Sequence, residues 1–241
     1  MKFASRWCSL FLFLGLAAAR AESSSTPALT IAIVGDSTVS TYSSANPLRG
    51  WGQMLPQFLD EKVKVVNLAI PGMSTRTFRP TGNWDKALAS HPDFVLIQFG
   101  HNDSHAPDKP ESTPASGEFM TNLERYVTEA RAVGAVPILV TPMHRRVFDA
   151  QGQLTRELLP YADSVRAVAE QMNVPLVDLY KSSGELFTGL GDAGSQDITA
   201  SATDKTHFTE KGATSMASLV AAELAKCDPK LAAAVRMPSS R

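Results

Sequence analysis

Two segments far apart in the chain carry residues that could act together on an ester. Ser37 follows Gly35 and Asp36, directly after an apolar run that is typical of a buried strand. Near the other end of the chain, Asp204 stands three positions before His207. A serine, a histidine and a carboxylate supply the nucleophile, the base and the orienting group of acyl transfer. Only a fold that returns the chain to its starting point can bring the two segments together.

Acyl transfer would give each of these side chains a role. The neutral imidazole of His207 would take the proton of the Ser37 hydroxyl and later protonate the departing oxygen. Asp204 would bind the other ring nitrogen and stabilise the imidazolium. The structural alternative is that Ser37 or Asp36 caps a helix and that His207 is an ordinary surface histidine. We expect Asp36 itself to be structural and to hold the turn.

The rest of the sequence predicts an α/β fold. Apolar runs suited to strands that are buried on both faces occur at 29–34, 63–68, 94–99, 136–141 and 174–179. Apolar residues at helical spacing occur at 51–62, 117–133, 158–172 and 209–226. A repeated order of strand and helix indicates a parallel sheet with helices on both faces. We predict one domain over 27–228 and a C-terminal tail over 229–241.

The polar residues of interest follow the predicted strands. In an open parallel sheet, ligands bind outside the carboxyl ends of the strands. The clusters at these ends are Gly35 to Thr38, Asn67 to Ser74, Gly100 to Asp103 and Thr141 to Arg146. We therefore expect them to meet at one rim of the sheet, where Asp103 braces the site through hydrogen bonds instead of acting on the substrate.

The N-terminal sequence predicts a secretion signal. Lys2 and Arg6 precede a single apolar stretch over 7–19, and Ala19-Arg20-Ala21 is a small-x-small cleavage signal. We predict that the signal peptide, residues 1–21, is removed and that the protein is exported to a periplasm or to the outside of the cell. An uncleaved signal anchor is the alternative. Because the apolar run is short for a bilayer, we expect no stable membrane anchor.

Composition argues against several classes of partner. The 241-residue chain is 44% apolar and 20% charged, as in ordinary globular proteins. Removal of the signal takes three of the 23 basic side chains and none of the 24 acidic ones. No polybasic face is then expected for nucleic acid or for an anionic membrane. Cys227 would be the only remaining cysteine, so no internal disulfide is expected.

Four short blocks occur in a characteristic order along the chain. They are Gly35-Asp36-Ser37, Ala69-x-x-Gly72-x-Ser74, Gly100-x-Asn102-Asp103 and Asp204-x-x-His207. With these blocks the chain resembles the SGNH, or GDSL-like, hydrolases over nearly all of its mature length. Further segments are similar to the rhamnogalacturonan acetylesterase family: Thr38-Val39, Arg49 to Gln53, Phe99 to Asp103, Thr141-Pro142 followed by Arg145-Arg146, and Phe208.

This resemblance implies a fold and an activity. The fold is a three-layer α/β/α sandwich around a flavodoxin-like, parallel, five-stranded sheet. The activity is that of a secreted serine esterase that removes O-acetyl groups from plant cell-wall polysaccharide, most closely rhamnogalacturonan, through an acetyl-enzyme intermediate. No metal ion and no other cofactor is implied. The family's oxyanion hole corresponds to the backbone N–H groups of Ser37 and Gly72 and the side-chain amide of Asn102.

Three further residues are candidates for binding the acetylated substrate. His101 is expected at the rim, with packing as its alternative role. Arg145 and Arg146 would suit the carboxylate of a galacturonate unit because a guanidinium presents planar, paired donors. The alternative for each arginine is an ordinary salt bridge. Trp51 and Trp84 could stack on sugar rings, although aromatic residues in such segments more often belong to the core.

Other functions compete with deacetylation of rhamnogalacturonan. Within the esterases, the alternatives are an acetylesterase acting on xylan or other oligosaccharides and a short-chain lipolytic enzyme. A more distant alternative is a non-catalytic module that binds carbohydrate or flavin, with the turn at 37–41 cradling a phosphate. That turn contains no further glycine, and a flavin site would leave Asn102 and His207 without a role.

Overall fold

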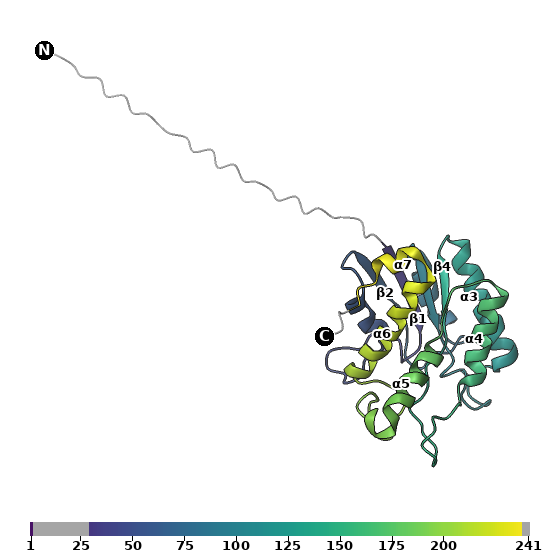
Figure 1. Cartoon of the computed structure of the whole chain (residues 1–241). Coiled ribbons are helices and arrows are strands. Elements are labelled where there is room, and N and C mark those ends of the chain that lie inside the picture. The colour runs from purple at the N-terminus through teal and green to yellow at the C-terminus, as the bar shows by residue number, and fades with distance from the viewer. Residues whose placement is uncertain (2–28, 238–241) are drawn as a thin grey trace.

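Five parallel strands form one sheet in the computed structural model (Figure 1). The strands are β1 (Leu29–Gly35), β2 (Val63–Asn67), β3 (Phe94–Gln98), β4 (Val136–Val140) and β5 (Leu176–Val177). Their order across the sheet is β2-β1-β3-β4-β5. The order therefore reverses between β1 and β3, and ligands of such sheets bind beyond the carboxyl ends of the two strands at that point.

The structure describes residues 29–237 together with Met1. The predicted signal peptide, residues 1–21, lies outside the described residues apart from Met1, and so do residues 22–28 and 238–241. Within the described part, no helix is both long enough and apolar enough to cross a membrane.

Alternate residues of the central strands face two separate hydrophobic cores. In β1, Ile31 and Ile33 pack into the core on one face, and Ala32 and Val34 pack into the core on the other. All four side chains are inaccessible to solvent. Burial on both faces is the reason for the continuous apolar run in the sequence.

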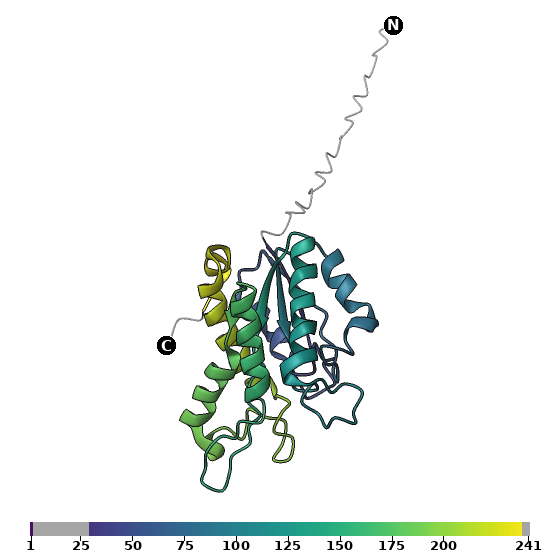
Figure 2. The same cartoon turned by 90° about the vertical axis from the view of Figure 1, so that its right-hand side faces the viewer.

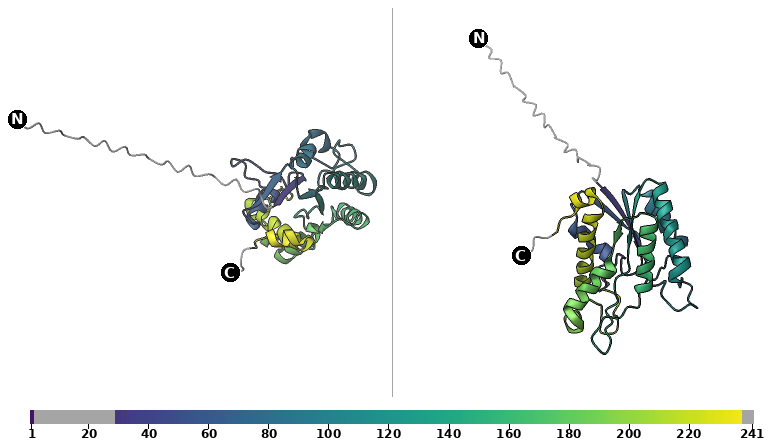
Figure 3. Two further views of the ribbon diagram at one scale, coloured as in Figure 1. Left: turned by 90° about the horizontal axis from the view of Figure 1, so that it is seen from above. Right: turned by 45° about the vertical axis from the view of Figure 1, so that its right-hand side comes forward.

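Helices cover both faces of the sheet (Figures 2 and 3). One layer contains α1 (Trp51–Met54), α5 (Leu179–Gly194), α6 (Glu210–Cys227) and α7 (Pro229–Ala234). The other contains α2 (Asn83–Ala89), α3 (Met120–Ala132) and α4 (Leu159–Gln171). The predicted three-layer α/β/α sandwich with a parallel five-stranded sheet is confirmed.

Two predicted helices start or end elsewhere because of local backbone chemistry. The helix expected over 51–62 is α1 followed by a 3-10 turn, η1 (Leu55–Phe58). Pro56 lacks an N–H and cannot continue an α-helix from α1. The helix expected from residue 117 begins at Met120 because a π turn, η3 (Ala115–Phe119), contains Gly117 at a φ of 120°. Only glycine adopts that value readily.

The predicted edges of the sheet and of the domain need correction. β2 is an edge strand with Lys64 exposed, and β5 is reduced to two residues, so neither is buried like the centre of the sheet. The tail expected over 229–241 begins with α7, in which Leu231 is fully buried. Asp228 caps this helix by accepting a hydrogen bond from the N–H of Lys230. The helices α2 and α5 and the 3-10 turn η2 (Arg79–Thr81) were not predicted.

Candidate active site

Ser37 lies on a tight turn at the carboxyl end of β1. The side chain of Asp36 accepts hydrogen bonds from the N–H of Thr38 at 2.9 Å and from its hydroxyl at 2.7 Å. The backbone carbonyl of Asp36 accepts from the N–H groups of Val39 and Ser40. Asp36 therefore holds the turn, as expected. A Cβ on Gly35 would lie 2.6 Å from the carbonyl oxygen of Gln98, so only glycine fits there.

Ser37, His207 and Asp204 form one continuous chain of hydrogen bonds. The Oγ of Ser37 lies 2.9 Å from Nε2 of His207, and Nδ1 of His207 lies 2.8 Å from Oδ2 of Asp204. The other carboxylate oxygen of Asp204 accepts from the backbone N–H groups of Thr206 and His207. Partial burial raises the pKa of Asp204, but these hydrogen bonds outweigh it and leave the pKa below its ordinary value.

The loop that presents His207 is attached to the body of the protein on both sides. The buried ring of Phe208 follows the histidine, and its backbone pairs with Arg49 and with Thr199. Thr209 then caps α6 by accepting from the N–H of Gly212. The backbone N–H of Arg146 donates to the carbonyl of Lys205 at 2.8 Å. These contacts return the end of the chain to the turn after β1.

One pocket of about 650 Å³ contains most of the predicted site residues. We call it the serine pocket; its lining includes Ser37, Tyr42, Leu48, Gly72, His101, Asn102, His105, Arg145, Asp204 and His207. Gly72 has a φ of 79°, and nothing lies within 4 Å of the position of a Cβ. The backbone conformation at Gly72, and not crowding, therefore favours glycine.

Asn102 follows β3 and enters the serine pocket from that strand, whereas Ser37 follows the neighbouring strand β1. Its Nδ2 donates to the carbonyl of Met73 at 2.9 Å, which fixes the plane of the amide. A primary amide has two N–H donors, so one remains for a ligand. Asn102 and the segment containing Gly72 are thus held together beside Ser37.

Asp103 braces the site from behind, as predicted. Its buried carboxylate accepts hydrogen bonds from the hydroxyls of Thr75 and Thr113 and from the N–H groups of Thr75 and Gly100. Burial raises the pKa of Asp103 to about 6, although these hydrogen bonds act in the opposite direction. The carboxylate links the loops that follow β2 and β3.

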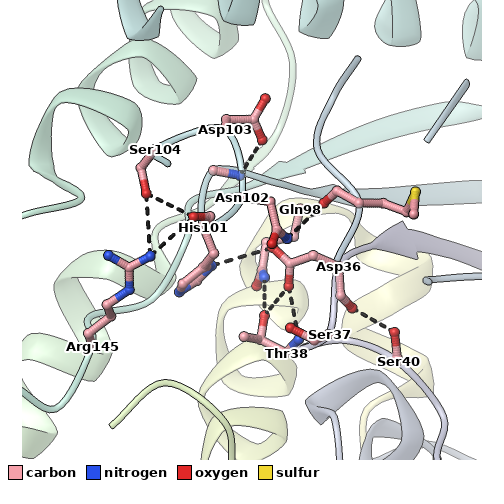
Figure 4. A network of polar contacts seen from close by, with 12 residues as sticks. Asp36, Ser37, Thr38, Ser40, Gln98, His101, Asn102, Asp103, Ser104 and Arg145 are labelled. Carbon is pink, nitrogen blue, oxygen red and sulfur yellow. Dashed lines mark hydrogen bonds and ion pairs between the residues drawn. The ribbon is translucent and has the colours of Figure 1, made fainter. Parts of the chain in front are cut away.

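His101 and Arg145 line the serine pocket. Figure 4 shows them in one polar network with Asp36 and Ser104. Nδ1 of His101 lies 3.4 Å from Oδ2 of Asp36. Burial by itself would raise the pKa of Asp36. The interaction with His101 and the hydrogen bonds from Thr38 have the larger effect, so the pKa lies below its ordinary value. The guanidinium of Arg145 donates to the carbonyl of His101 at 3.1 Å and pairs with Glu157 at 3.1 Å. Arg145 is therefore partly engaged within the protein.

Arg146 does not line the serine pocket, and the prediction that it binds substrate needs correction. Its side chain is 3% exposed. The guanidinium donates to the hydroxyl of Thr199 at 3.0 Å and binds Asp192. Arg146 is thus a structural link between the segment after β4 and the end of α5. Because Arg145 and Arg146 are adjacent, the sequence alone does not indicate which of the two is buried.

The two tryptophans belong to the core. Trp51 is fully buried and donates its indole N–H to Gln98 at 2.7 Å. Gln98 in turn donates to the hydroxyl of Thr38 on the serine turn. Trp84 is buried in the opposite layer and donates to Glu129. Neither indole is therefore available to stack on a sugar.

Tyr42 is a residue of the serine pocket that we did not predict. Its phenol donates to the backbone carbonyl of Ser37 at 2.8 Å, and its ring is half-buried. Burial and the negative charges of Asp36 and Asp204 raise its pKa to about 12, so the phenol keeps its proton. The signal in the sequence was slight: an aromatic residue with a polar tip, in a loop shortly after the serine.

Comparisons with known proteins agree with the geometry of this site. The model of the GDSL-like Lipase/Acylhydrolase family matches residues 33–214. A rhamnogalacturonan acetylesterase of Bacillus subtilis is 36% identical over 209 residues, which cover 80% of this chain and 88% of that protein. A probable rhamnogalacturonan acetylesterase of the same organism is also 36% identical, over 79% of this chain and 90% of its own length.

Solved structures show the same architecture. The crystal structure of the Bacillus subtilis protein YxiM has a TM-score of 0.74 at 30% identity. The match covers 82% of this chain and 56% of that one, so this chain spans just over half of that protein. An acetylxylan esterase from Geobacillus stearothermophilus has a TM-score of 0.64 at 23% identity, over 81% of this chain and 94% of that one. At that identity the likeness concerns the fold alone.

Proposed function

The chain belongs to the GDSL-like lipase/acylhydrolase family, and from this premise we propose that it is an exported enzyme that removes O-acetyl groups from rhamnogalacturonan. It is an ester hydrolase, as its acetylesterase relatives are. The observation that carries the proposed mechanism is the contact between Oγ of Ser37 and Nε2 of His207 at 2.9 Å.

The first half of the reaction forms an acetyl-enzyme. Oγ of Ser37 attacks the acetyl carbonyl carbon while Nε2 of His207 takes the hydroxyl proton. Asp204 accepts the Nδ1–H bond and stabilises the imidazolium. The carbonyl oxygen becomes an oxyanion, for which the N–H groups of Ser37, Gly72 and Asn102 are the proposed donors. When the C–O bond to the sugar breaks, His207 protonates the departing sugar oxygen.

The second half restores the enzyme. A water molecule gives a proton to His207 and attacks the acetyl carbon through its oxygen. The same donors stabilise the second oxyanion. The bond to Oγ of Ser37 breaks, the serine takes back the proton from His207, and acetic acid leaves and ionises in water. This sequence balances protons without any other group.

The substrate class is supported by the relatives and by the serine pocket. Two relatives at 36% identity are named rhamnogalacturonan acetylesterases, one of them as probable. Most of the side chains that line the pocket are polar, among them Arg145 and His105, and a sugar bearing a small acyl group suits it better than a long acyl chain. A relative at 26% identity is named an acetylxylan esterase, which keeps acetylated xylan as the second candidate.

Acetate release from matched polymers tests the proposed substrate. We expect the wild-type protein to release acetate faster from acetylated rhamnogalacturonan than from acetylated xylan or acetylated homogalacturonan. Ser37→Ala should abolish release from all three, whereas Ser43→Ala, a serine of an exposed loop, should leave the rates unchanged. Equal slow rates on the three polymers would contradict the pectin assignment, and turnover by Ser37→Ala would contradict the nucleophile.

Export is proposed from residues 1–21 alone. Expression of the full chain in a bacterium, followed by mass spectrometry of the periplasmic and external fractions, should yield a chain that begins at residue 22. A full-length chain retained with the membrane would contradict removal of the signal.

A further inference from the structure

A second hollow of about 760 Å³ lies outside the serine pocket. It is bordered by the hairpin that follows β4 and by α5. We call it the basic groove; its polar lining is His144, Gln153, Arg156, Lys181, Glu185 and Thr188. Figure 2 shows α5 and the loop between β4 and α4 at the end of the molecule where the strands have their carboxyl ends. The basic groove therefore opens at the same end as the serine pocket.

The hairpin forms a wall between the two hollows. Its arms are joined by a bridge between Phe148 and Leu154. At its base, His144 and Arg156 line the basic groove, while Arg145 lines the serine pocket. The neighbouring residues His144 and Arg145 thus line different hollows.

Two cations of the basic groove are not engaged within the protein. Arg156 and Lys181 are exposed, and among residues 29–237 neither has a carboxylate within the 4.0 Å of an ion pair. Arg145, the arginine that lines the serine pocket, is by contrast paired with Glu157. Glu185 is the one carboxylate of the described lining, so the groove keeps an excess of positive charge.

His144 adds a neutral hydrogen-bond acceptor to the groove. Its Nδ1 donates to the carbonyl of Thr155 at 3.2 Å, and its ring stacks on Tyr180 at 3.8 Å. Burial lowers the pKa of His144 to about 4, so the imidazole is neutral at neutral pH and Nε2 carries no proton. A Cβ on Gly184 would lie 2.9 Å from Nε2, so only glycine lets α5 pack this closely on the ring without covering the nitrogen; His144 as a whole is 9% exposed.

We propose that the basic groove binds a uronate unit of the same polysaccharide, at a distance from the acetyl group that is cleaved. Arg156 and Lys181 would bind the carboxylate, and Nε2 of His144 would accept a hydrogen bond from a sugar hydroxyl. A small anion without a hydroxyl group, such as sulfate, fits less well, because it would bring no hydrogen-bond donor to His144. This inference rests on the proposed function, because it concerns the acidic backbone of that substrate.

Binding of an unacetylated oligosaccharide tests the groove separately from catalysis. Trigalacturonate is titrated by calorimetry into the wild-type protein, into the double variant Arg156→Ala/Lys181→Ala and into the control Lys86→Ala/Arg125→Ala. The control removes the same charge from exposed positions on α2 and α3, in the other helical layer. We expect the groove variant to bind about tenfold more weakly or worse, and the control to bind like the wild type.

Two further measurements define the outcome. Turnover of 4-nitrophenyl acetate should be the same in all three proteins, because the small ester does not reach the groove. Neutral xylotriose should not distinguish the variants. Absence of trigalacturonate binding by the wild type, or equal binding by the groove variant, would overturn the proposal. Groove-dependent binding without acetate release from rhamnogalacturonan would instead refute the proposed function and leave the groove assignment standing.

Discussion

The phenol of Tyr42 donates a hydrogen bond of 2.8 Å to the backbone carbonyl of Ser37. Tyr42 is itself held by Gln53, which accepts from its N–H at 3.0 Å and donates to its carbonyl at 3.2 Å. The loop after the serine turn is thereby folded back over that turn. One side chain both restrains the peptide of the proposed nucleophile and forms a wall of the serine pocket.

Substitution of Tyr42 should separate these two roles. Tyr42→Phe removes one neutral hydrogen bond and keeps the ring, so kcat should fall about fivefold with little change in KM. Tyr42→Ala should also raise KM for acetylated oligosaccharide more than for 4-nitrophenyl acetate. The control Tyr126→Phe loses a comparable bond to the carbonyl of Thr75 and should affect stability only. An unchanged kcat in Tyr42→Phe would show that the bond does not position Ser37.

Asn102→Ala should lower kcat by roughly 10² to 10³ if its amide binds the oxyanion. The variant also loses the bond to the carbonyl of Met73, which could loosen the loop. Asn83→Ala controls for that loss, because Asn83 makes a similar bond to the carbonyl of Leu68 outside the serine pocket. Steady-state rates with 4-nitrophenyl acetate distinguish the two effects. A decrease of only a few-fold in Asn102→Ala would remove the residue from the proposed oxyanion hole.

Asp204→Asn should lower kcat on the order of 10⁴, since an amide favours the wrong tautomer of His207. Asp197→Asn is a suitable control, because Asp197 pairs with Lys211 on the surface before α6 and does not contact His207. The thermal midpoints of both variants should stay near that of the wild type. A loss of less than tenfold in Asp204→Asn would mean that other groups orient the imidazole.

Arg145 and Arg146 should give opposite phenotypes although they are neighbours. Arg146→Ala leaves a cavity and an unpaired Asp192, and should cost about 1–2 kcal/mol of unfolding free energy; half of the Asp192 side chain is exposed, which limits the loss. Its KM should not change. Arg145→Ala should raise KM for the acetylated uronate polymer and affect stability less. Denaturant unfolding and kinetics on both variants test the pair, and a raised KM in Arg146→Ala alone would reverse the assignment.

Asp103 should make stability fall as pH rises. Its folded pKa of about 6 lies above the ordinary value of 3.8, so the folded protein binds the proton more tightly than the unfolded chain. The contribution is greatest below pH 3.8 and is lost as pH rises through about 6, which amounts to about 2 kcal/mol between pH 4.5 and 7.

The effect of Asp103 must be measured against a variant, because His144 changes the unfolding free energy over the same pH range in the opposite direction. Its folded pKa of about 4 lies below 6.5, so its contribution grows as pH rises. Denaturant unfolding of the wild type and of Asp103→Asn between pH 4.5 and 7 isolates the carboxyl group. The difference in unfolding free energy between the two proteins should change by about 2 kcal/mol over this interval. A constant difference would contradict the raised pKa.

Much of the architecture was predictable from local patterns. Central strands such as β1 and β3 contain continuous apolar runs because both of their faces are buried. The helices α3, α4 and α6 contain apolar residues at helical spacing because one stripe of each packs on the sheet. Short elements were not predicted: α7 has six residues, and its burial depends on its packing against α6.

The sequence by itself determined which residue types stand at the carboxyl ends of the strands, and hence that Ser37, Gly72 and Asn102 could meet at one rim. This was possible because strand ends in a parallel sheet converge whatever the loops do. Only the tertiary structure decided that Arg146 is buried, that Tyr42 covers the serine turn, and that Arg156 and Lys181 face a common groove. Those relationships depend on contacts between side chains from distant segments, and no local periodicity records such contacts.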